Sequence, residues 1–147
     1  MNKRFCIIAN CCLLVWFFLD MFGFSIGNVT LVEAAWNDID GIMYLIFIGL
    51  FILFCVKDRY GRYPLAVFLF LWIAMQFASH WYYTIFGATE AKIAGYNSFY
   101  ANTFHVVPAS DSILVPDLYH ILLHALILFA LICTILFCVK NRKKRTE

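Results

Sequence analysis

Residues 41–56 read GIMYLIFIGLFILFCV, a run without a charged side chain, and this stretch decides the fold. An α-helix rises about 1.5 Å per residue, so roughly 20 mainly apolar residues cross the hydrocarbon core of a bilayer. With its flanking residues, the run predicts a membrane-spanning helix over about 39–57. Stretches of the same character predict three further spans, at about 5–26, 64–86 and 117–139.

The overall composition supports the same class. Of the 147 residues, 64% are apolar and only 14% are charged, whereas about a quarter of the residues of a soluble domain are charged. We therefore predict an all-α integral membrane four-helix bundle that forms one domain over residues 1–147. The composition shows no nucleic-acid-binding surface, and the lipid bilayer is the expected partner.

Basic residues predict the orientation of the bundle. Lysines and arginines precede the first span, separate the second from the third and follow the fourth, and only Lys92 lies on the opposite side. Because segments rich in these residues stay in the cytoplasm, both termini are predicted to be cytoplasmic, with a basic tail over 140–147. In a bacterial cell the membrane would be the plasma membrane. A cleaved signal peptide in place of the first span would leave the other orientations unchanged.

The segment between the third and fourth spans, about 87–116, is too long for a simple connector. It is also rich in aromatic and aliphatic residues. We expect this long outer loop to cap the helix ends.

The strongest polar pattern is PDLYHILLH over residues 116–124, at the start of the fourth span. Spacings of three and four residues place Asp117, His120 and His124 on one helical face. Two imidazoles one turn apart can bind one metal ion, and a neighbouring carboxylate can serve as a third ligand or orient an imidazole. The alternatives are an N-cap role for Asp117 and structural hydrogen bonds for the two histidines.

All four histidines fall in the predicted outer half, as does Asp20 near the end of the first span. Ionisable groups within the hydrocarbon are costly, so they are expected to face the bundle interior. The sequence thus predicts one pocket that opens outward. Its candidate metal ligands are His80, His120 and His124, and its candidate catalytic acids are Asp20 and Asp117.

Such a pocket favours a metal-dependent, hydrolase-like membrane enzyme that uses zinc on a lipid or small amphiphile. The combination of Ser79-His80, an intramembrane Asp20 and His120-x-x-x-His124 is similar to the ligand pattern of the membrane hydrolases that include the alkaline ceramidases. The resemblance covers only these residues, and those proteins have seven spans.

Two alternatives remain open from the sequence. The first is a haem-binding electron-transfer subunit, with one imidazole from the third span and one from the fourth. The second is a non-catalytic accessory protein whose pocket binds a lipid, or which binds a protein partner or a second copy of itself.

Overall fold

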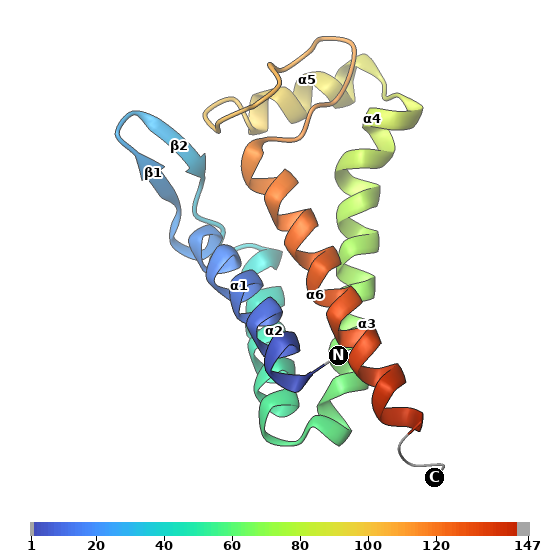
Figure 1. Cartoon of the computed structure of the whole chain (residues 1–147). Helices are drawn as coiled ribbons and strands as arrows, with labels where there is room; N and C mark the ends of the chain where they lie inside the picture. The colour runs from blue at the N-terminus through green and yellow to red at the C-terminus, as the bar shows by residue number, and fades with distance from the viewer. Residues whose placement is uncertain (1, 144–147) are drawn as a thin grey trace.

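The computed structural model describes residues 2–143 and shows a mostly helical chain with one small two-stranded sheet (Figure 1). Four helical stretches are long and apolar enough to cross a membrane, by length and composition. They are α1 (Lys3–Phe22), α2 (Ile39–Val56), the continuous helix from Asp58 to Phe86, and α6 (Leu118–Lys143). The last four residues of the predicted basic tail, 144–147, lie outside the described residues, and α6 continues through the first four.

The third long helix consists of three segments. α3 (Asp58–Gln76) is followed by a π-helical turn, η1 (Phe77–Trp81), and by α4 (Tyr82–Phe86). This helix begins earlier than the span predicted over about 64–86, because α3 starts at Asp58 and Pro64 lies inside it. Asp58 occupies the first turn, where a negative charge is favourable, and only Lys57 separates α2 from α3.

A β-hairpin corrects the prediction of an all-α chain and of a first helix that extends to about residue 26. α1 ends before Gly23, whose φ of 73° lies in the region that favours glycine. β1 (Phe24–Ile26) then pairs antiparallel with β2 (Val29–Val32). An isolated bridge from Thr30 to Thr103 ties the hairpin to the segment before α6.

The predicted outer segment contains a helix, α5 (Glu90–Phe99), which lies with the following irregular chain beyond the ends of α4 and α6 (Figure 1). Thr89 caps α5 by accepting a hydrogen bond from the backbone N–H of Lys92. Ile93 and Leu114 are buried, so the segment packs onto the protein. We call residues 87–116 the cap, and the end of the bundle beside it the capped end.

The core of the bundle is aromatic. Trp72 of α3 packs against Phe17 of α1 and Phe47 of α2, with ring centroids 4.6 and 5.7 Å apart. α6 packs against both α1 and α3.

The end of the bundle opposite the cap is called the basic end. There the Lys3 ammonium donates a hydrogen bond to the Cys55 carbonyl (3.0 Å) and lies 3.9 Å from the Asp58 carboxylate.

Candidate functional site

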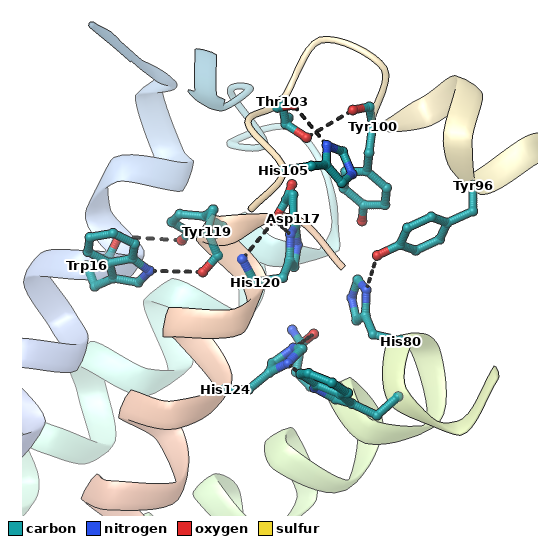
Figure 2. A network of polar contacts seen from close by, with 12 residues as sticks. Trp16, His80, Tyr96, Tyr100, Thr103, His105, Asp117, Tyr119, His120 and His124 are labelled. Carbon is teal, nitrogen blue, oxygen red and sulfur yellow. Dashed lines mark hydrogen bonds and ion pairs between the residues drawn. The ribbon is translucent and has the colours of Figure 1, made fainter. Parts of the chain in front are cut away.

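Three of the four histidines meet near the capped end. Figure 2 shows their rings between the third long helix and α6, with Tyr96 and Tyr100 of the cap beside them. The His80 and His120 ring centroids lie 4.6 Å apart, and the His124 centroid lies 5.2 Å from that of His80. The structure therefore brings together three side chains from two helices that are far apart in the sequence.

The π-helical turn positions His80. The backbone N–H of Tyr82 donates to the Phe77 carbonyl, an i to i+5 bond that includes one more residue than a normal turn. π turns are rare and occur often at functional sites. The Thr84 hydroxyl lies 3.2 Å from the His80 carbonyl and 2.7 Å from that of Leu114, linking this turn to the cap.

Asp117 holds His120 in place. Its Oδ1 accepts hydrogen bonds from the backbone N–H of His120 (2.9 Å) and from Nδ1 of the same residue (2.7 Å). The carboxylate thus caps α6 and also fixes the imidazole. Burial alone would raise the Asp117 pKa, but the hydrogen bonds and the nearby His120 hold that pKa below its usual value. With the proton on Nδ1, a neutral His120 keeps a lone pair on Nε2.

His124 differs from His120 because both of its ring nitrogens have protein partners. Its Nδ1 lies 2.6 Å from Nε1 of Trp81, and because an indole N–H can only donate, this nitrogen must accept. The proton of the neutral ring is then on Nε2, which lies 3.0 Å from the Gln76 amide oxygen. Both nitrogens of His124 are satisfied by the protein, so neither is free for a metal in this arrangement.

His80 resembles His120 rather than His124. Its Nδ1 lies 2.7 Å from the Tyr96 hydroxyl. Burial raises the pKa of Tyr96 and that of Tyr100, so both phenols are protonated at neutral pH. No side chain among residues 2–143 hydrogen-bonds Nε2 of His80 or of His120, so neither of these nitrogens has a protein partner in the described chain.

A cavity of about 230 Å³ lies next to His120. Phe99 and Tyr100 of the cap form part of its wall, and neither Lys nor Arg is among the described residues that line it. We call this cavity the acidic pocket. Its acidic lining residues are Asp20, Glu33, Asp38, Asp40 and Asp117, and His120 lies among them.

The two predicted catalytic acids both line the acidic pocket. Asp117 is fully buried, and its Oδ2 has no hydrogen-bond partner in the described chain. Asp20 is 7% exposed, and no group in residues 2–143 donates a hydrogen bond to its carboxylate. Nearby, Trp16 stacks on Tyr119 and donates to its carbonyl (3.2 Å), which fixes α1 against α6.

The fourth histidine is His105, which contacts the backbone of the cap. His105 lies in the cap, where its Nδ1 is 3.0 Å from the Thr103 carbonyl (Figure 2). Gln76, Trp81 and Tyr96, each of which contacts a histidine, were not predicted from the sequence. The four-residue spacing of Tyr96 and Tyr100 in the cap was the available signal for the two tyrosines, whereas nothing local marked Gln76.

The described part of the chain contains no group of three or more His, Cys, Asp or Glu side chains arranged to hold a metal ion. Comparison with protein-family models, with curated proteins and with solved structures finds no match. Proposals about function therefore depend on the geometry of this site.

Proposed function

We propose that the chain is a four-span membrane protein with cytoplasmic termini and an outward-facing capped end. Four long apolar helices support the first part, and the clustering of Lys and Arg supports the second. The contacts of Lys3 with Cys55 and Asp58 are consistent with this, because they join the first basic segment to the second.

Cysteine labelling tests the orientation. We expect a membrane-impermeant maleimide added to intact cells to label Ser112→Cys in the cap above the level of the parent chain. Thr146→Cys, which lies outside the described residues, should react only after the membrane is permeabilised. The reverse pattern would overturn the proposed orientation.

We also propose that the site is that of a metal-dependent, hydrolase-like enzyme, in which His80 and His120 hold zinc. One observation carries this proposal: the two rings lie 4.6 Å apart, and each has its Nδ1 anchored while Nε2 stays free. Histidines that bind metals characteristically donate their other N–H to a carboxylate, carbonyl or water, as His120 does to Asp117. His124, in contrast, supports the site through Trp81 and Gln76.

A bound zinc ion would polarise a carbonyl and lower the pKa of water toward neutrality. Asp117 would orient His120 through Oδ1, and its unpartnered Oδ2 could accept a proton. Asp20, which lines the same pocket from α1, would orient the substrate. The site would act on a lipid or small amphiphile that enters from the outer water or the outer leaflet.

Metal analysis of the protein in mild detergent, purified without a histidine tag, tests the zinc site. We expect about one zinc per chain, lost in His80→Gln and in His120→Gln. The matched variant His124→Gln should retain zinc, because it removes a ring whose nitrogens are already engaged. Full zinc content in both of the first two variants would refute the assignment.

Turnover tests the hydrolase proposal separately. Zinc-loaded protein in mixed micelles with ester- and amide-linked lipids should release fatty acid. Release should stop after chelation and resume when zinc is restored. Zinc binding without any turnover would favour the non-catalytic lipid- or partner-binding protein, a reading also supported by the lack of a three-ligand group among the described residues.

The haem alternative is less well supported by the ring geometry. His80 and His120 are in direct contact at 4.6 Å and tilted by 33°, so a porphyrin between them would require the two rings to separate. An optical spectrum of the same preparation decides this point, since a Soret band would show bound haem and favour the electron-transfer alternative.

A further inference from the structure

The acidic pocket is lined by an excess of acidic side chains, of which Asp20 and Asp117 are buried. Five carboxylates line a cavity of about 230 Å³, and no lysine or arginine among the lining residues compensates them. A cavity lined by charges of one sign raises the local concentration of ions of the opposite sign. The pocket is therefore suited to a cationic ligand.

Two of these carboxylates belong to buried side chains and have at least one oxygen without a hydrogen-bond partner in the described chain. Asp117 is fully buried and its Oδ2 has no partner, while the carboxylate of Asp20, 7% exposed, receives no hydrogen bond from residues 2–143. Both side chains line the pocket from different helices, α1 and the start of α6. Leaving the buried Asp117 Oδ2 unpaired costs free energy, and a ligand with several N–H donors would offset this cost while also reaching the Asp20 carboxylate.

We infer that the acidic pocket binds a primary ammonium group of the ligand, with Asp20 as its main partner. This inference rests on the proposed function, because the ligand is taken to be the substrate. The hydrolysed ester or amide would then lie close to that ammonium, since His120 lines the same cavity. Water would add to the acyl carbon and the bond to the alcohol or amine would break, giving a carboxylic acid and the alcohol or amine.

The lining favours a primary ammonium over other cations. An R–NH₃⁺ group has three N–H donors for the unpartnered oxygens, whereas a quaternary ammonium has none. A hard divalent ion takes six or more oxygen ligands and fills little of the cavity. Phe99 and Tyr100 offer aromatic surface for the organic part of an amine, which a bare metal ion would not use.

Calorimetric titration of chelator-treated, zinc-free protein in detergent tests the inference. The probe is butylammonium chloride, and butyltrimethylammonium chloride is the matched cation without N–H donors. We expect the trimethyl compound to bind at least about tenfold more weakly, and Asp20→Asn to weaken butylammonium binding by about tenfold. Asp38→Asn, at an exposed lining position, should weaken it less.

Glu90→Gln is the control for these variants, because it removes an acid of the capped end that does not line the pocket. It should leave butylammonium binding unchanged. Equal binding of the two cations, displacement of both by calcium chloride, or absence of binding would each overturn the inference. Since zinc is absent from the titration, these outcomes are independent of the zinc analysis, and either proposal can fail without the other.

Discussion

The two ends of the bundle use polar residues in opposite ways. Near the basic end, polar side chains of α1 and α6 bond to each other and to nearby carbonyls and do not line the acidic pocket. At the capped end, Asp20 and His120 line that pocket and have side-chain atoms without a partner in the described chain. The connections differ as well, since only Lys57 joins α2 to α3, while a hairpin and a 30-residue cap surround the site. Under the proposed function, the basic end maintains the fold and the capped end binds the ligand.

The polar cluster in the half near the basic end shows the contrast in detail. Asn10 donates to the Cys6 carbonyl (2.9 Å) and lies 3.4 Å from the Thr134 hydroxyl, which donates to the Ala130 carbonyl (2.7 Å). The amide oxygen of Asn10 has no hydrogen-bond partner in the described chain. None of these residues lines the acidic pocket, so the cluster acts between helices.

The largest expected effect concerns the close approach of α2 and α3. A Cβ on Gly61 would overlap backbone atoms of Phe54, which a side-chain movement cannot relieve, whereas a Cβ on Gly49 would meet nothing within 4 Å. We expect Gly61→Ala to destabilise the protein by about 3 kcal/mol or more, measured by unfolding in mixed detergent micelles. Gly49→Ala is the control and should be neutral or slightly stabilising.

Equal stability of these two variants would show that the basic end tolerates expansion, and the contrast between the ends would then be wrong. A low yield of folded Gly61→Ala protein in the membrane would itself support the prediction, provided that Gly49→Ala is produced normally.

A second prediction separates binding from stability at the capped end. Asp117→Asn should weaken zinc binding by about 10- to 100-fold, because a neutral amide orients His120 less strongly than a carboxylate. Asparagine is as good an N-cap as aspartate, so the stability of α6 should change little. Zinc affinity is measured by competition with a chelator, and unfolding of the metal-free protein gives the stability.

Asp58→Asn makes the same charge change at the basic end and should leave zinc affinity unaltered. If Asp117→Asn lowered stability by as much as Gly61→Ala while zinc affinity stayed the same, Asp117 would serve only as the N-cap residue of α6.

The sequence predicted the long helices well because their signal is local. A run of about 20 apolar residues identifies each one without reference to its neighbours. The hairpin was missed because Phe24 and Ile26 were read as the end of the first helix. Gly27 and Asn28 between two apolar residues are nevertheless a recognised two-residue turn signal, and Gly27 has a φ of 60°.

The site was predictable only in part. Helical spacing and the cost of ionisable groups in a bilayer were enough to group His80, His120 and His124. Which ring nitrogens are free depends on Trp81, Gln76 and the π turn, and these contacts exist only in the folded chain. Spacing alone therefore predicted His80, His120 and His124 as equivalent metal ligands. In the structure, both ring nitrogens of His124 have protein partners, whereas Nε2 of the other two does not.

The smallest expected effect concerns the cluster near the basic end. Thr134→Val keeps the side-chain shape but removes the hydroxyl that lies between Asn10 and the Ala130 carbonyl. Hydrogen bonds between helices in membranes contribute about 0.6 kcal/mol on average and up to about 1.7, so we expect a loss of stability in this range and no change in zinc or butylammonium binding. A double-mutant cycle with Asn10→Ala isolates the interhelical pair. A coupling energy near zero together with altered ligand binding would mean that the two ends are not separate, and that the cluster near the basic end influences the site through α6.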